Sequence, residues 1–210
     1  MKPSRKKGVS FIYNSAPFEL AIFSSEKDYP NELKLVLDLF KAGLKRFHLR
    51  KPHSDLESIR NYLSSIPKEY RERVYVHYDR KLAEEFGCKL HLQFKFAVIQ
   101  GEVQECDSVS VHSLEEFEQI DGHVKSCTLS PIFESISKEN YAANPELDRI
   151  PKKRETQVLA LGGVDADTVI KSRELGFNGA ACLGAIWHSE GEPLANFKKI
   201  ESAIQLELVE

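Results

Sequence analysis

Short apolar segments that alternate with helical segments are the feature that most constrains the fold of this chain. Eight segments of five to seven residues are rich in β-branched and aromatic residues or alternate them with small ones. This alternation is typical of repeated βα units around a parallel sheet. We therefore expect strands at Phe18–Ser24, Arg46–Arg50, Val74–Tyr78, Lys89–Gln93, Ser108–His112, Val124–Ser130, Gln157–Leu161 and Asn178–Leu183.

Two of the intervening segments have helical periodicity. Residues Asn31–Ala42 place their apolar side chains on one face, and Asp165–Leu175 starts with an aspartate and precedes Gly176. These patterns predict two amphipathic helices. The segments between the fourth, fifth and sixth strands are short, so we expect one or two stunted helices there.

Eight strands with intervening helices predict an α/β fold, a compact (β/α)₈ TIM barrel smaller than the ~250 residues usual for that fold. The alternative is an open, doubly wound sheet. No GxGxxG or Walker sequence follows the first expected strand, which argues against a nucleotide-binding open sheet. We expect residues 1–17 to form an N-terminal arm and residues 18–210 to form one barrel domain.

Charge and cysteine content limit the classes of partner. The 29 lysines and arginines nearly balance the 32 acidic residues, for a formal net charge of −3 at pH 7. No strong positive field is available to attract nucleic acid or an anionic membrane, so we expect a small-molecule substrate. The four cysteines lack CxxC spacing, and no export signal is evident, which favours a cytoplasmic location. The sequence does not determine the oligomeric state, and it is compatible with a homo-oligomer.

Polar segments follow several of the expected strands. Barrel active sites lie at the carboxyl ends of the strands, so these segments are the first candidates for substrate contacts. They follow strands two, three, five and six, at His48–Pro52, His77–Arg80, Val111–Ser113 and Ser130–Lys138.

Small residues follow the last two expected strands, Gly162 and Gly163 after the seventh and Gly184 and Ala185 after the eighth. In barrels this pair of loops commonly holds a phosphate through backbone N–H groups. The alternative is that the glycines only permit tight turns. Because they occur after both strands, we favour a phosphate site.

Six short motifs occur in order between Phe18 and Ile186. They are Arg50 after the second strand, Asp79-Arg80 with Ala83, His91-Leu92, SVHSLEEF at 110–117, PIFxSxSK at 131–138 and ALGGV at 160–164. With these motifs the chain resembles the thiamine-phosphate synthase and TenI thiazole tautomerase family. The resemblance implies a (β/α)₈ barrel that binds hydroxyethylthiazole phosphate in thiamine biosynthesis.

The resemblance also implies roles for particular residues. In TenI-like tautomerases a histidine within the same SVHS sequence moves a proton on the thiazole phosphate carboxylate, which implies that His112 is catalytic. Imidazole suits this work because it titrates near neutral pH. The alternative is a histidine that only forms hydrogen bonds in the barrel mouth. Lys138 matches a family lysine and is expected to be catalytic as well. Substrate contacts are expected from His48, Arg50, Lys51, Asp79, Ser130 and Ser135.

The chain departs from the family at the magnesium site. Synthases of the family carry N-D after strand three and HxGQxD after strand four, whereas this chain has Tyr78 before Asp79, and Phe96 at the second aspartate. One carboxylate is a poor Mg²⁺ site. We therefore expect no metal or other cofactor in a tautomerase, and Mg²⁺ only if the chain is a synthase.

Three functions remain after this comparison of motifs. A TenI-type thiazole tautomerase is favoured, because it needs no magnesium aspartates. The alternatives are thiamine-phosphate synthase (thiamine-phosphate pyrophosphorylase), which joins a pyrimidine pyrophosphate to the thiazole phosphate, and a barrel that only binds a phosphorylated metabolite. The sequence has no HxH or HExxH zinc pattern, so His77 and His91 are expected to be structural.

Overall fold

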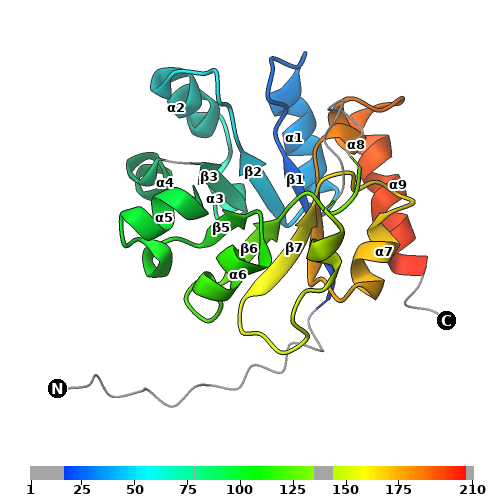
Figure 1. The fold of residues 1–210 in the computed structure, drawn as a ribbon. Helices are drawn as coiled ribbons and strands as arrows, with labels where there is room; N and C mark the ends of the chain where they lie inside the picture. The colour runs from blue at the N-terminus through cyan, green and yellow to red at the C-terminus, as the bar shows by residue number, and fades with distance from the viewer. Residues whose placement is uncertain (1–16, 78, 135–143, 207–210) are drawn as a thin grey trace.

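Eight parallel strands close into a barrel in the computed structural model, which describes residues 17–77, 79–134 and 144–206 (Figure 1). The strands follow one another around the barrel in chain order, and β1 pairs with β8 to close it. The predicted (β/α)₈ barrel is thus confirmed, and the alternative of an open sheet is wrong. The strands are β1 (Glu19–Phe23), β2 (Arg46–Leu49), β3 (Val74–His77), β4 (Lys89–Gln93), β5 (Ser108–Val111), β6 (Ser126–Leu129), β7 (Gln157–Leu161) and β8 (Gly179–Cys182).

Helices surround the strands, as Figure 1 shows. The α-helices between β4 and β5 and between β5 and β6 have only six and seven residues, which confirms the stunted helices expected there. The helices are α1 (Glu32–Lys41), α2 (Leu56–Ser64), α3 (Lys68–Arg71), α4 (Arg80–Phe86), α5 (Phe94–Ile99), η1 (Val103–Glu105), α6 (Leu114–Ile120), η2 (Pro145–Asp148), α7 (Val169–Glu174), α8 (Gly184–Trp187) and α9 (Pro193–Leu206). None of the described helices combines the length and apolar composition needed to span a membrane.

Two expected boundaries differ from the observed ones by two residues or more. The helix expected from Asp165 begins at Val169, because Oδ1 of Asp165 accepts the N–H groups of Asp167 and Thr168 and closes a turn before the helix. The strand expected from Val124 begins at Ser126. There the carbonyl of Val124 accepts a hydrogen bond of 2.9 Å from the Thr156 hydroxyl.

Two different environments lie on the two faces of the strands. Side chains on the outer face, such as Ile22, Phe47 and Val76, belong to the main apolar core between the strands and the helices. Among the described residues, the barrel interior contains a small apolar cluster, Ala21, Phe23, Leu159 and Ala181, together with many polar side chains. The interior is therefore unusually polar for a packed barrel.

The amino-terminal end of the barrel is closed by Arg46. Its Nε donates a hydrogen bond of 2.9 Å to Glu19, and one terminal nitrogen donates a bond of 3.0 Å to the Ser126 hydroxyl. The guanidinium also lies 4.5 Å from the centre of the Tyr75 ring, a cation–π distance. These residues are the first or second residues of their strands, so their side chains fill the amino-terminal end of the barrel. A ligand-binding site is therefore expected at the carboxyl ends of the strands.

Candidate functional site

His112 lies directly after β5, at the carboxyl end of the barrel, and its side chain is exposed. Its Nδ1 is 3.1 Å from the carbonyl oxygen of Ser130 and 3.2 Å from the Ser130 hydroxyl. Because a carbonyl oxygen can only accept, this contact places the proton on Nδ1. Nε2 of His112 is then left with a lone pair and can act as a base.

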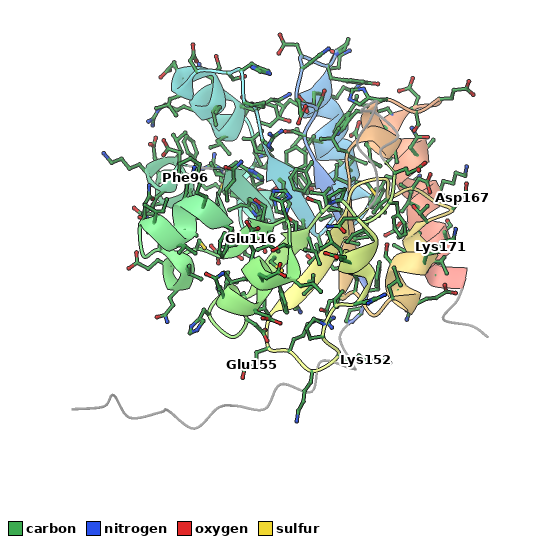
Figure 2. All side chains as sticks on the ribbon, viewed as in Figure 1. Phe96, Glu116, Lys152, Glu155, Asp167 and Lys171 are labelled. Carbon is green, nitrogen blue, oxygen red and sulfur yellow. The ribbon has the colours of Figure 1, made fainter. Side chains whose placement is uncertain are left out.

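The start of α6 holds the backbone of His112. The hydroxyl of Ser113 accepts the N–H of Glu116 at 3.2 Å, and Oε2 of Glu116 accepts the N–H of His112 at 2.7 Å. This arrangement resembles a capping box, with the glutamate reaching one residue further back than usual. Figure 2 shows Glu116 at this end of α6. The SVHSLEEF sequence therefore forms both the helix start and the support for the histidine.

Arg50 follows β2 and is tied to the end of β1. Its guanidinium forms an ion pair with Glu26, and its N–H donates a hydrogen bond of 2.9 Å to the Ser24 hydroxyl. That hydroxyl donates in turn to the carbonyl of Arg50, also at 2.9 Å. The loops after the first two strands are thus joined, and an incoming anion would have to compete with Glu26.

Lys51 turns toward a different surface. It forms an ion pair with Glu32, and the two side chains are only 9% and 6% exposed. Burial raises the pKa of Glu32, and the contact with Lys51 opposes that rise. Both residues line a pocket of about 480 Å³ between α1 and α2, whose lining among the described residues does not include His112 or Ser130. The structure therefore does not place Lys51 in one pocket with His112.

The magnesium ligands that the resemblance implies do not fit this chain. Oδ1 of Asp79 accepts the N–H of Leu82 at 2.7 Å and caps α4. Phe96, labelled in Figure 2, lies in the first turn of α5 and is 46% exposed. A phenyl ring offers no oxygen to a hard cation, so residue 96 cannot supply the second carboxylate that synthases of the family carry there.

The glycines after β7 are covered by the segment that follows β6. The N–H of Ile132 donates to Leu161 at 3.0 Å, and the N–H of Phe133 donates to Gly162 at 3.1 Å. A Cβ atom on Gly163 would lie 2.1 Å from the carbonyl oxygen of Glu134. The close approach of these two chain segments is thus one physical reason for a glycine at position 163. A structural reason of this kind is what we expect if the glycines only permit tight turns.

Gly184 and Ala185 open the short helix α8. Across the described parts of the chain, no backbone acceptor outside that helix is recorded for their N–H groups. These two N–H groups lie at the carboxyl end of β8, where the phosphate is expected. The expected phosphate site at Gly162, Gly163, Gly184 and Ala185 stays a prediction.

Three histidines on consecutive strands meet inside the barrel. His48, His77 and His91 are buried, and one ring nitrogen of each lies within 4.8 Å of one ring nitrogen of the other two. Burial lowers the pKa of His91 to about 3, and burial with the neighbouring histidines lowers the pKa values of His48 and His77 well below the ordinary range. All three imidazoles are therefore neutral at physiological pH.

Sequence reasoning missed this histidine cluster, the set His48, His77 and His91. It assigned His48 to substrate and treated the other two as separate structural residues. No local spacing could reveal the cluster, because each histidine is on a different strand. The available signal was a histidine next to apolar residues in three consecutive strands, FHL, VH and LHL.

Three expected residues lie outside the part of the chain that the structure describes. They are Tyr78, Ser135 and Lys138. The roles predicted for Ser135 and Lys138 therefore stay predictions.

The fold and the polar residues at its carboxyl end define a (β/α)₈ barrel of the class that binds ligands at this end of the strands. No family model matches the sequence. The chain is 27% identical over 184 residues to the thiamine-phosphate synthase of Prochlorococcus marinus, a match that covers 81% of this chain and 53% of the relative. The chain thus spans about half the length of this curated relative. The similarity to thiamine-phosphate synthases that the motifs indicate is confirmed.

Solved structures agree on the fold. The thiamine phosphate pyrophosphorylase of Bacteroides thetaiotaomicron is 24% identical, with a TM-score of 0.70 over 90% of this chain and 99% of that one. The corresponding protein of Pyrococcus furiosus is 16% identical, with a TM-score of 0.73 over 91% and 97%. The 3-hexulose-6-phosphate synthase of Salmonella typhimurium has a TM-score of 0.64 at 15% identity, over 90% and 99%. At these identities the similarity supports the barrel fold.

Proposed function

We propose that this chain is an enzyme of thiamine biosynthesis that binds hydroxyethylthiazole phosphate and catalyses a TenI-type tautomerisation. One observation carries the proposal: His112 lies exposed at the barrel mouth, with its Nδ1 proton directed to the Ser130 carbonyl. Tautomerisation removes a proton from one atom of the ring system and delivers one to another. A single imidazole can do both, because Nε2 accepts the first proton and the imidazolium then returns one.

The loops around His112 provide candidate contacts for the two anionic groups of a thiazole phosphate carboxylate. The N–H groups of Gly184 and Ala185 are suited to the phosphate, together with the turn at Gly162 and Gly163. Arg50 offers the planar donors that suit a carboxylate, after exchange of its partner Glu26. No metal takes part in this mechanism, because only protons move.

Thiamine-phosphate synthase is the second candidate function. Two observations favour it: the sequence motifs and the similarity to a curated relative named thiamine-phosphate synthase. It is opposed by Phe96 at the position of a magnesium aspartate and by the use of Asp79 as a helix cap. The residues at the expected metal site bear directly on the synthase reaction, whereas the similarity does not. We therefore rank the synthase below the tautomerase.

Two assays on the purified protein distinguish these functions. The first incubates it with thiazole phosphate carboxylate in D₂O and follows the ring protons by NMR and deuterium uptake by mass. The second adds the pyrimidine pyrophosphate and Mg²⁺ and measures thiamine phosphate. We expect isomerisation in the first assay and little product in the second. Efficient product formation only in the second would replace the tautomerase with the synthase, and binding without reaction in either would leave a barrel that only binds its ligand.

A further inference from the structure

The histidine cluster occupies the barrel interior on β2, β3 and β4. His48 lies between Phe47 and Leu49, whose side chains belong to the outer core, and His91 lies likewise between Leu90 and Leu92. Because side chains alternate between the two faces of a strand, the histidines point inward. His77 and His91 are directly opposite each other in the strand register.

Aromatic packing holds the rings in place. His48 stacks between Phe23 and Tyr75, with ring centres 4.4 Å and 4.8 Å away and nearly parallel planes. The His77 and His91 rings stack on each other at 4.2 Å. The three imidazoles are carried on rigid strands, and the stacked His77 and His91 rings must tilt before a nitrogen of each can face one ion.

The hydrogen bonds within the cluster do not use all of its nitrogens. Nδ1 of His48 and Nε2 of His77 are 3.1 Å apart, so one donates to the other. Nε2 of His48 and Nδ1 of His91 are buried and have no hydrogen-bond partner among the described residues. Buried polar atoms are nearly always satisfied, by protein, by water or by a bound ion.

We propose that His48, His77 and His91 form a binding site for a divalent transition-metal ion, with zinc as the expected occupant. In a tetrahedral zinc site with Zn–N distances of 2.0–2.1 Å, the ligand nitrogens are about 3.3 Å apart. The nitrogens of the cluster lie within 4.8 Å of one another, so side-chain shifts of about 1–1.5 Å would complete the site.

The chemistry of the donors selects the class of metal. Neutral imidazole is a ligand for zinc, copper, nickel and iron, whereas magnesium and calcium require oxygen. A neutral imidazole has one ring nitrogen with a lone pair, and that nitrogen can bind the metal. Three protein ligands leave a fourth position for water or an anion, as in zinc sites that are not purely structural.

Carboxylates partly neutralise the positive charges of the two arginines that act on the histidine cluster. Arg46 and Arg50 both disfavour protonation of the cluster, which means that they contribute a positive potential there. Arg46 is paired with Glu19 and Arg50 with Glu26, and these carboxylates reduce that potential. A positive field opposes the binding of a cation, so the pairing of both arginines with carboxylates favours the site. This inference uses none of the residues assigned to proton transfer and goes beyond the proposed function.

The experiment uses the full chain without an affinity tag, stripped of metal by a chelator and then titrated with Zn²⁺ or Co²⁺. We expect one metal per chain, a rise in melting temperature with Zn²⁺, and the intense visible bands of tetrahedral Co²⁺. His48→Gln and His91→Gln should each weaken Co²⁺ binding at least about 100-fold, more than the loss of an outer-sphere contact. His123→Gln and His188→Gln alter exposed histidines and should bind as the unaltered chain does.

Two outcomes would overturn the proposal. One is an unaltered chain that binds no Co²⁺ at micromolar concentrations, a measurement that does not depend on any variant folding. The other is a His91→Gln protein with native circular dichroism that keeps the affinity and the spectrum of the parent. In either case the cluster would be three packed imidazoles with ordered water. The thiazole assays are independent of this result, so failure here and failure of the proposed function are distinguishable.

Discussion

The backbone N–H of His112 donates a hydrogen bond of 2.7 Å to Oε2 of Glu116, four residues further along the chain. The same glutamate offers its own N–H to the Ser113 hydroxyl at the start of α6. The segment that carries the proposed proton-transfer residue is therefore fixed by a helix cap. Glu116 is a positioning residue in this arrangement, because it holds the backbone of His112, whose ring contacts Ser130.

Replacing Glu116 with Ala should lower both stability and turnover. Loss of the cap interaction is expected to cost about 0.5–2 kcal/mol. Turnover of thiazole phosphate carboxylate should fall several-fold with little change in KM, because the histidine loses its fixed position. Glu116→Gln keeps an acceptor oxygen and should recover most of the turnover. The control is Glu118→Ala on the exposed side of α6. Equal kinetics in Glu116→Ala and the control would refute the positioning role.

The central prediction concerns His112 itself. Replacing it with Asn should lower turnover by about 10²–10⁴-fold, the usual contribution of general acid–base catalysis. Asn can keep a hydrogen bond to the Ser130 carbonyl but cannot exchange a proton at neutral pH, so the affinity for hydroxyethylthiazole phosphate should change far less. Stopped assays give turnover, and calorimetric titration gives affinity. Full activity in the variant would assign proton transfer to another group.

A third prediction follows from the buried thiols. Burial raises the pKa of Cys88 and of Cys106 to about 11, and it raises the pKa values of Cys127 and Cys182 further. At pH 8 only about 10⁻³ of a thiol with a pKa of 11 is thiolate, and the thiolate is the reactive form. Iodoacetamide should therefore label the native chain at least about 100-fold more slowly than the chain in guanidinium, with a rate that rises toward pH 10. Fast labelling of native Cys88, located by peptide mass, would contradict this.

The fold could be predicted from the sequence because strand and turn signals are local. β4 and β7 have the expected bounds, and the other strands begin and end within two residues of the expected positions. The start of α7 could not be predicted from the sequence. An aspartate at position 165 is compatible with a helix cap and with a turn before the helix, and in the structure its side chain closes a turn.

The candidate site could be predicted only in part, and the reason is again physical. His112 and Ser130 both end strands of adjacent βα units, so barrel geometry alone brings them together. Lys51 is one residue past Arg50, yet it pairs with Glu32 in an outer pocket, which depends on side-chain direction. The histidine cluster required knowledge of the strand register, since one residue of slip would turn the rings outward.

A fourth prediction tests why the synthase ranks second. The variant with Phe96→Asp and Tyr78→Asn restores the residues that the family carries at these positions. It should bind Mg²⁺ more tightly than the parent, because a second carboxylate joins Asp79. Tautomerisation should not change, since it moves only protons. Mg²⁺ titration and the two product assays measure these effects. Phe96→Leu is the matched control, because it removes the ring without adding a carboxylate.

The final prediction concerns two glycines with nearly the same backbone angle. Gly87 has a φ of +66° and Gly163 a φ of +64°, so a change to Ala imposes a similar strain at both, about 1–2 kcal/mol. A Cβ at Gly87 meets nothing within 4 Å, whereas at Gly163 it meets the carbonyl of Glu134 at 2.1 Å and Cβ of Phe133 at 2.7 Å.

Gly163→Ala should therefore destabilise the chain by about 1–3 kcal/mol more than Gly87→Ala, the usual cost of forcing extra atoms into a packed region. For a chain of this size each kcal/mol corresponds to a shift of about 2–4 °C in the melting temperature, which scanning calorimetry can resolve. The variant should also bind hydroxyethylthiazole phosphate more weakly, because the segment after β6 must move away from β7. Equal melting temperatures for the two variants would show that this segment does not pack on Gly163 in solution.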